Sequence, residues 1–180
     1  MKGAPGDLVA RARSGDTEAW GEIYREYAPA IHRFCRRVLP TREDAEDATT
    51  EIFLKVRVKI EQVDPARPFA PWLYRVAANH CWDQLRRGRR EPDADAEPAT
   101  VASPEPGPEE QFVTERTRQE VRAALHRLPP RARLALVMRY FAELPYREIA
   151  GALEVNEGFV GVLLLRARRQ LRETLVNIKP

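Results

Sequence analysis

Basic and aromatic residues alternate along one face of a predicted helix that proline begins and glycine ends. The helix runs from Pro68 to Arg87, and Gly88 follows it. Steps of three and four residues bring together cations, an amide and flat rings, namely Trp72, Arg75, Asn79, Trp82 and Arg86. Arginine holds phosphates and aromatic rings accept unstacked bases, so this face is typical of a surface for single-stranded nucleic acid. The alternative is that both tryptophans are core and the arginines are its solvated edge.

Other helices must bury the neighbouring, apolar face of this helix. Its apolar stripe is Phe69, Leu73, Val76, Ala77 and His80. Two earlier segments have apolar residues at helical spacing, one from Asp16 to Leu39 and one from Thr41 to Ile60. Asp16 is expected to cap the first of them, and Thr41 with Asp44 resembles a capping box for the second. The 16–87 segment is therefore predicted to be a compact all-helical bundle.

Acidic side chains gather in the first turns of the predicted helix that Thr41 begins. They are Asp44, Glu46, Asp47 and Glu51. Acid at a helix start complements the helix dipole, so the cluster has a purely structural explanation. A docking surface for a basic partner explains it equally well at this point.

An acidic, proline-rich stretch separates the bundle from the rest of the chain. Residues 91–110 hold seven acids, five prolines and no Lys or Arg. This composition cannot bury enough apolar surface to fold, which predicts an extended, flexible linker. Setting the seven acids aside from the net charge of +3 leaves +10 on the rest of the chain, which indicates a polyanionic partner.

The third part of the chain is predicted to hold a helix-turn-helix. A helix to about Arg127 is followed by one that Pro130 begins, then by a short helix from Leu144-Pro145. A turn at Glu154-Val155 and a cap at Asn156 lead to the last helix. The second helix of such a pair enters the DNA major groove. We expect an all-α fold of two small domains, 1–90 and 111–180, joined by the linker 91–110.

Several function classes are excluded by what the sequence lacks. No segment has the apolar length to span a membrane and the N-terminus lacks a signal peptide's apolar core, so we expect a cytoplasmic protein. Cys35 and Cys81 are expected to be small buried thiols, without a disulfide. His32 and Cys35 share a helix face but lack the further ligands of a zinc site. No nucleophile-base pair or phosphate-binding glycine loop appears, so we expect no catalysis, cofactor or metal.

The bundle and the helix-turn-helix part each hold a set of short motifs. The first set runs from Asp44-Ala45-Glu46-Asp47 through Phe69-Ala70-Pro71-Trp72-Leu73-Tyr74-Arg75 to Leu85-Arg86-Arg87. The second set runs from Leu128-Pro129-Pro130-Arg131 through Leu144-Pro145-Tyr146-Arg147-Glu148 to Arg166-Ala167-Arg168. The two sets resemble regions 2 and 4 of the extracytoplasmic-function (group 4) sigma factors, which direct bacterial RNA polymerase to promoters.

The resemblance implies partners for each of these surfaces. In region 2 it implies docking on the clamp helices of the largest polymerase subunit by Asp44, Asp47, Glu51, Phe53 and Val56. It implies that promoter melting and minus-ten contacts come from Trp72, Arg75, Asn79, Arg86 and Arg87. In region 4 it implies contact with the polymerase flap and the minus-thirty-five element, through Arg147, Phe159, Arg166, Arg168 and Arg169. An anti-sigma factor is a further expected partner, and no membrane insertion is expected.

The last helix departs from the family pattern. Polar contact positions of the family hold Gly161, Val162, Leu163 and Leu165 here. Valine and leucine cannot hydrogen-bond a base edge, and exposed apolar residues mark protein interfaces. We therefore predict that Val162, Leu163 and Leu165 form a protein interface.

Two alternatives stay open on the sequence alone. The chain is either a promoter-selecting sigma factor or a degenerate sigma-like protein that binds an anti-sigma factor or polymerase without minus-thirty-five recognition. The two domains of the free protein are either separate or packed together over the DNA-binding surface.

Overall fold

The computed structural model describes residues 6–64, 66–88 and 119–176, all of whose regular structure is helical. The expected all-α fold is confirmed for these residues. The first unit holds α1 (Gly6–Arg13), α2 (Thr17–Val38), α3 (Arg42–Lys59), the short η1 turn (Ile60–Gln62) and α4 (Phe69–Gly88). The second holds helical residues 119–126, α6 (Pro130–Tyr140), α7 (Tyr146–Leu153) and α8 (Glu157–Val176). The predicted linker, 91–110, lies outside the described residues.

The helix caps expected from the sequence are formed. The Asp16 carboxylate accepts hydrogen bonds from the backbone N–H groups of Glu18 and Ala19 at the start of α2. Thr41 and Asp44 form a reciprocal capping box at the start of α3. The Asn156 side chain accepts a hydrogen bond of 2.8 Å from the backbone N–H of Phe159, which caps α8. Each cap satisfies backbone donors that a helix start leaves without partners.

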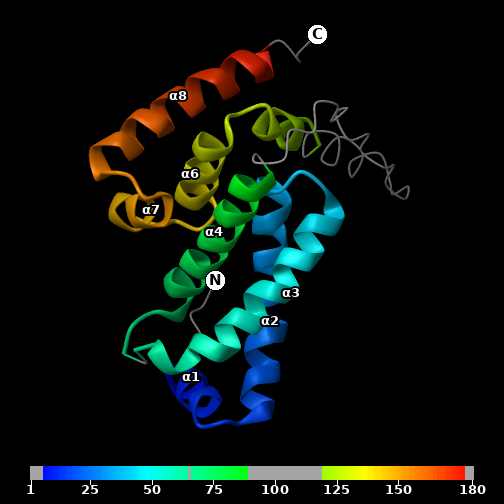
Figure 1. The fold of residues 1–180 in the computed structure, drawn as a ribbon, viewed down its shortest axis with the longest axis vertical. Coiled ribbons are helices and arrows are strands. Elements are labelled where there is room, and N and C mark those ends of the chain that lie inside the picture. Colours follow the sequence, from blue (N-terminus) through cyan, green and yellow to red (C-terminus); the bar gives the residue numbers. More distant parts are fainter. Residues whose placement is uncertain (1–5, 65, 89–118, 177–180) are drawn as a thin grey trace.

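The turn between α7 and α8 depends on a left-handed backbone. Glu154 ends α7 with φ 53° and ψ 48°, and its backbone N–H bonds to the Ala150 carbonyl. This conformation, which glycine usually supplies, reverses the chain within three residues so that α8 starts beside α7. Figure 1 shows α8 lying across the end of the molecule above α6 and α7. The predicted helix-turn-helix is therefore formed by α7 and α8.

The inner stripe of α4 is the centre of the first unit. Phe69, Leu73, Ala77 and Cys81 are almost completely buried where α4 packs on α2 and α3. Trp82, on another side of α4, is also buried. Figure 1 shows α4 between α2 and α3 on one side and α6 and α7 on the other. The two units therefore pack against each other, and their buried residues form one continuous cluster.

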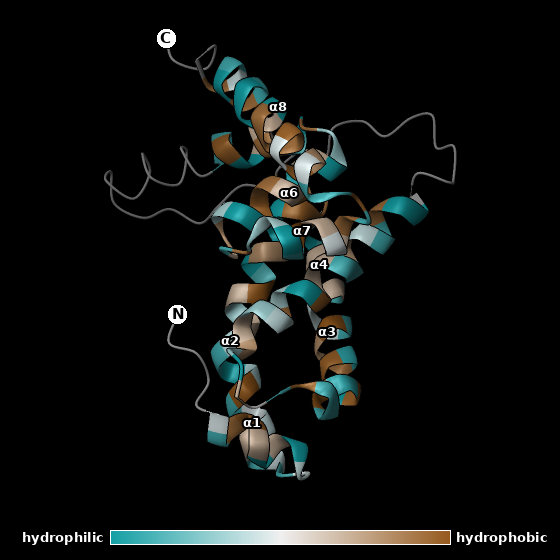
Figure 2. Ribbon diagram, turned by 90° about the vertical axis from the view of Figure 1, so that its left-hand side faces the viewer, coloured by the Kyte–Doolittle hydropathy of each residue, from teal (hydrophilic) through white to brown (hydrophobic). Residues whose placement is uncertain are grey.

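The distribution of hydrophobic residues agrees with this packing of the helices. Figure 2 shows hydrophobic and hydrophilic residues alternating along α2, α3 and α4, as amphipathic helices require. The part of α8 near its label is largely hydrophobic, whereas its end nearest the C-terminus is mostly hydrophilic. No helix of the described residues is long and apolar enough to cross a membrane.

Candidate nucleic-acid and protein interfaces

The basic face of α4 is formed largely as predicted. Arg75, Asn79, Arg86 and Arg87 are exposed, and Trp72 is half-buried. The Trp72 ring lies 5.7 Å from that of Phe69, with an interplanar angle of 32°. Because Phe69 belongs to the core, it fixes the Trp72 ring at the edge of the surface, where one part of the ring stays open to solvent. Arginine, amide and ring therefore share one side of the helix, as contacts to phosphates and bases require.

Trp82 does not belong to this face, which corrects the prediction made from spacing. It is only 7% exposed, and the guanidinium of Arg131 from α6 lies 4.8 Å from its ring. The indole Nε1 has no hydrogen-bond partner among the described residues. The packing of the second unit on α4 buries this ring, so no base can stack on it here. For Trp82 the core alternative is the correct one.

Two of the predicted DNA-binding arginines already have partners. Arg75 Nη1 lies 3.3 Å from Glu148 Oε2, and Arg86 Nη1 lies 3.4 Å from Glu154 Oε2. Both carboxylates come from the helix-turn-helix unit, at the start and the end of α7. A carboxylate binds a guanidinium with the same donor geometry that a phosphate uses. The acidic side chains of α7 therefore occupy groups on α4 that a nucleic-acid backbone would need.

The predicted polymerase-docking residues of α3 do not all lie on one surface. Asp47 and Glu51 are exposed, whereas Phe53 and Val56 are buried. Phe53 packs edge-on against Tyr24, with ring centroids 4.8 Å apart, and so belongs to the α2–α3 contact. The prediction that Phe53 and Val56 form an outer docking surface is therefore wrong for this structure, because both side chains are needed in the core.

Asp44 has a structural role in addition to its predicted docking role. Its Oδ2 accepts hydrogen bonds from the hydroxyl and the backbone N–H of Thr41, at 2.7 and 3.2 Å. Its Oδ1 accepts a longer hydrogen bond of 3.4 Å from Gln84 on α4. The carboxylate thus stabilises the start of α3, and this part of the acid cluster has the helix-capping explanation.

Sequence reasoning missed two exposed apolar residues on the same helix. Leu54 is 60% exposed and Val58 is 80% exposed. With Asp47 and Glu51 they follow one another at steps of four, three and four residues and so form one outer row, which we call the α3 stripe. Helical spacing alone could have predicted that Leu54 and Val58 are exposed, because a helix that buries Ile52, Val56 and Ile60 leaves positions 54 and 58 on its opposite side.

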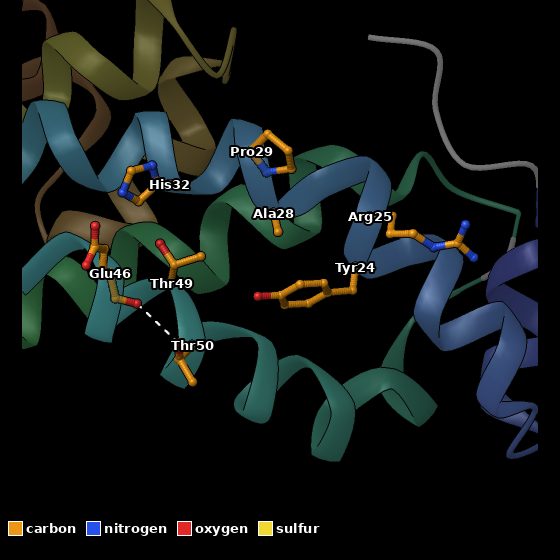
Figure 3. A pocket seen from close by; sticks show the side chains of 8 residues that line it. All are labelled: Tyr24, Arg25, Ala28, Pro29, His32, Glu46, Thr49 and Thr50. Carbon is orange, nitrogen blue, oxygen red and sulfur yellow. Dashed lines mark hydrogen bonds between the residues drawn. The ribbon is translucent and has the colours of Figure 1, made fainter. Parts of the chain in front are cut away.

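A groove lies between α2 and α3 (Figure 3). It has a volume of about 490 Å³ and is lined by Tyr24, Arg25, Ala28, Pro29, His32, Glu46, Thr49 and Thr50. The Tyr24 ring extends from α2 into the space between the two helices. The His32 Nε2 atom is buried without a hydrogen-bond partner among the described residues. Burial lowers the pKa of His32 below its ordinary value, so this ring is neutral at pH 7.

A second histidine joins the stripe helix to α4. His80 is buried, and its Nδ1 lies 2.7 Å from Lys55 Nζ. Its Nε2 lies 3.8 Å from Glu51 Oε2. Burial and then the Lys55 charge lower the pKa of His80, so Lys55 donates to a neutral ring and Nε2–H faces Glu51. The Lys55–His80 hydrogen bond thus joins α3 to α4.

The helix-turn-helix surface is basic in one part and apolar in another. Arg147, Arg166, Arg168 and Arg169 are exposed, and Phe159 is half-buried. In the first half of α8, Val162 is 39% exposed and Leu165 is 62% exposed. Leu163, by contrast, is only 8% exposed, so its predicted place in a protein interface is wrong. Leu163 faces inward because it is adjacent to Val160, Leu164 and Ala167 in the α8 core stripe.

The two cysteines are close in space although they are far apart in sequence. Cys35 and Cys81 are free and buried, with their Sγ atoms 3.8 Å apart between α2 and α4. The hydrogen bond with Cys35 and burial raise the pKa of Cys81 well above its usual value, so the thiol form is favoured. The predicted buried, unbridged thiols are confirmed. In the described part of the chain, no three His, Cys, Asp or Glu side chains gather as a metal site would need.

A cationic contact holds the second unit on the last turns of α2. Arg133 is buried and its Nη1 donates to His126 Nδ1 over 2.6 Å, while the His126 ring also hydrogen-bonds the backbone of Arg36. Arg37 lies over the Phe141 ring, 3.9 Å from its centroid. Burial and the Arg133 charge lower the pKa of His126 to about 4. The neutral His126 ring thus accepts a hydrogen bond from Arg133 of the second unit and contacts the backbone of Arg36 in the first unit.

Comparisons with known proteins identify both helical units. Residues 23–91 match the family model of sigma-70 region 2, and residues 118–171 match that of sigma-70 region 4. The chain is 35% identical over 169 residues to the ECF RNA polymerase sigma factor SigE of Mycolicibacterium smegmatis, covering 91% of this chain and 65% of that protein. It is 29% identical over 179 residues to the ECF RNA polymerase sigma factor SigW of Bacillus subtilis, covering 94% of this chain and 96% of the other.

Solved structures share the fold. The sigma factor RpoE of Bartonella quintana, in complex with the anti-sigma factor NepR, has a TM-score of 0.69 and 20% identity, covering 88% of this chain and 98% of that one. CnrH, in complex with the cytosolic domain of CnrY, has a TM-score of 0.65 and 23% identity, covering 98% and 99%.

Acidification should destabilise the fold through His126. The folded pKa of about 4 lies below the ordinary value of 6.5, so the stabilisation is complete above pH 6.5 and is lost as pH falls through 4. From pH 7 to 4 we expect the free energy of unfolding to fall by up to about 3 kcal/mol more in the native protein than in His126→Gln, which cannot titrate. Urea unfolding across this pH range measures the difference, and parallel curves for the two proteins would contradict it.

Proposed function

We infer that this chain, which belongs to the sigma-70 family as an extracytoplasmic-function RNA polymerase sigma factor, binds core polymerase and directs promoter recognition, melting and transcription initiation. The observation that carries this function is the pairing of two matched regions, 23–91 and 118–171, each on its own helical unit. The chain spans 65% of the SigE relative and 96% of the SigW relative.

Core polymerase binding is assigned to the α3 stripe. Asp47 and Glu51 supply negative charge for a basic partner, and Leu54 and Val58 supply exposed apolar area beside it. A charged row with adjacent apolar residues suits a helical partner such as the clamp helices of the largest polymerase subunit. Glu51 Oε2 also lies 3.8 Å from His80 Nε2, which places this carboxylate on the side of α3 nearest α4.

Promoter melting is assigned to the outer face of α4. Arg75, Arg86 and Arg87 would hold phosphates of the non-template strand, while Trp72 and Asn79 would meet bases of the minus-ten element. A base that has left the duplex offers its edge for reading and its plane for stacking. The half-buried Trp72 ring, which packs on Phe69 one turn before Arg75 on the same helix, supports this assignment.

Upstream DNA and regulatory proteins are assigned to the helix-turn-helix unit. Arg147, Arg166, Arg168, Arg169 and Phe159 are retained as the proposed minus-thirty-five contacts. The first turns of a reading helix normally contact bases, and here they present Val162 and Leu165. We assign these two side chains to a protein contact, with an anti-sigma factor or the polymerase flap. The structural relatives RpoE and CnrH were each solved in complex with another protein, for RpoE the anti-sigma factor NepR.

The remaining assignments follow from this role. We place the chain in group 4 of the family, give it no catalysis of its own and locate it in the cytoplasm, where polymerase acts. The domain limits 1–90, 91–110 and 111–180 remain our proposal. Neither the family matches nor the structural likenesses favour the degenerate interaction protein as an alternative.

Replacing the apolar half of the α3 stripe should weaken polymerase binding. In Leu54→Asp with Val58→Asp we expect at least a tenfold loss of core polymerase affinity, because two exposed apolar contacts become desolvated charges. Tyr140→Asp, a matched change of an exposed apolar side chain in the other unit to which no partner is assigned, should leave core polymerase binding unchanged. Size-exclusion co-elution and fluorescence anisotropy with bacterial core polymerase measure both. Equal core polymerase affinities of the native protein and both variants would show that the α3 stripe is not part of the docking surface.

Polar substitutions in α8 should weaken its binding to a protein partner and strengthen its binding to DNA. Val162→Ser with Leu165→Arg adds one cation and one hydroxyl to the first half of a helix that already carries four exposed arginines. We expect about tenfold tighter binding to upstream duplex DNA and weaker binding of the anti-sigma or flap partner. Gel-shift titrations at fixed salt measure the DNA affinity. The assignment of Val162 and Leu165 to a protein contact fails if both affinities stay as they were.

A further inference from the structure

Four arginines and one histidine converge where the end of α2 meets the second unit. Arg36 and Arg37 lie in the last turn of α2, Arg122 and His126 lie on helical residues 119–126, and Arg133 lies on α6. The His126 ring hydrogen-bonds the backbone of Arg36 and accepts from Arg133 Nη1. Residues four apart share a helix face, so Arg122 lies on the same side of its helix as His126. We call these four arginines around His126 the arginine cluster.

Neighbouring acids do not balance the positive charge of the arginine cluster. Burial lowers the pKa of Arg36 and Arg37, and the Arg122 charge lowers both further, which shows that these guanidinium groups lie near one another. Within the described residues, no ion pair joins a carboxylate to any arginine of the cluster. Glu46 acts on Arg36, but Arg42 already binds its carboxylate at 2.7 Å.

Arg133 adds a buried cation to the cluster. Its side chain is only 5% exposed, and its Nε atom has no hydrogen-bond partner among the described residues. Burial lowers the pKa of Arg133 to about 10, so its guanidinium is still charged at pH 7. A buried charge with only a neutral partner such as His126 is destabilising, and an anion placed nearby would offset that cost.

The cluster is both held in place and open to a ligand. The Arg37 guanidinium carbon lies 3.9 Å from the centroid of the Phe141 ring, which orients this side chain. The His126 ring connects Arg133 to the end of α2. Arg36, Arg37 and Arg122 are only half-buried, so an anion can reach them from solvent. Cations that are positioned before binding lose little side-chain freedom when an anion arrives.

We propose that the arginine cluster is a binding site for a small oligophosphate, an anion with several phosphoryl groups in a short chain. Guanidinium groups bind phosphate oxygens through charge-assisted hydrogen bonds, often two at a time. The cations come from three helices and surround one imidazole, which suits a compact anion with concentrated charge. A nucleic-acid backbone instead carries its charge in a row, like the arginines along α4. The site uses none of the residues assigned to polymerase or promoter contacts, so it does not depend on the proposed function.

Calorimetric titration with inorganic tripolyphosphate at physiological ionic strength tests the site. Arg36→Gln with Arg122→Gln should weaken binding at least about tenfold relative to the native protein, because two charged donors are lost. The matched control is Arg13→Gln with Arg172→Gln, which removes the same charge from one exposed arginine in each unit. The control should bind within about twofold of the native protein. No binding by the native protein, or equal losses in the two variants, would overturn the proposal.

The choice of anion tests the class of ligand and separates its two sources, inorganic oligophosphate and a nucleoside triphosphate. Inorganic monophosphate at matched ionic strength should bind at least about tenfold more weakly than tripolyphosphate. Equal affinities for ATP and tripolyphosphate support a site for the phosphate chain alone, and tighter ATP binding supports a site that also contacts the nucleoside. The proposal is overturned if monophosphate binds as tightly as tripolyphosphate. It is also overturned if the cluster variant loses affinity for a single-stranded oligonucleotide as steeply as for tripolyphosphate.

The three histidines of the chain report where the anion binds in the native protein, whether or not the variants fold. A bound oligophosphate stabilises a nearby imidazolium, so tripolyphosphate should raise the pKa of His126, which Arg36, Arg122 and Arg133 surround. His32 and His80 lie elsewhere in the first unit, and their pKa values should not change. Nuclear magnetic resonance titration of the ring protons measures all three, with His126→Gln to assign the signals. An unchanged pKa of His126 in the presence of saturating tripolyphosphate would overturn the placement of the site.

Discussion

The burial of α4 on two sides is the constraint on which the rest of the structure depends. Its inner stripe, with Phe69, Leu73 and Ala77, completes the core of the first unit, and each of these side chains is at most 1% exposed. Its outer side carries the arginines that the second unit contacts. Because one rigid helix supplies both the core and the contact surface, the position of α7 decides what else can reach Arg75 and Arg86.

Charge explains why the second unit meets α4 through α7. It contacts this basic helix through Glu148 of α7 and the cap residue Glu154, while Arg147, Arg166, Arg168 and Arg169 remain exposed. Apolar and aromatic contacts, such as Trp82 under Arg131, add orientation without closing the outer surfaces of α3 and α8.

Local features of the fold were predictable from the sequence, and contacts between distant segments were not. Caps at Asp16, Thr41 and Asn156 depend on neighbours within three residues, so spacing predicted them correctly. Trp82 was misplaced because helical spacing shows which residues share a face but not which other helix covers that face. Phe53 and Leu163 were given outer roles from the family resemblance, which does not show how far each side chain is buried in this chain. The pairing of Arg75 with Glu148 joins residues 73 positions apart, and no periodicity within either helix indicates it.

Transcription in vitro tests the central claim most directly. Purified protein would be added to bacterial core polymerase on sheared genomic DNA of the source organism, and transcript starts would be mapped by sequencing. The account predicts protein-dependent starts behind a shared minus-ten motif, and loss of those starts in a variant with Trp72→Ala, Arg75→Ala and Asn79→Ala on α4. Core polymerase binding without any protein-dependent start would contradict a promoter-selecting sigma factor.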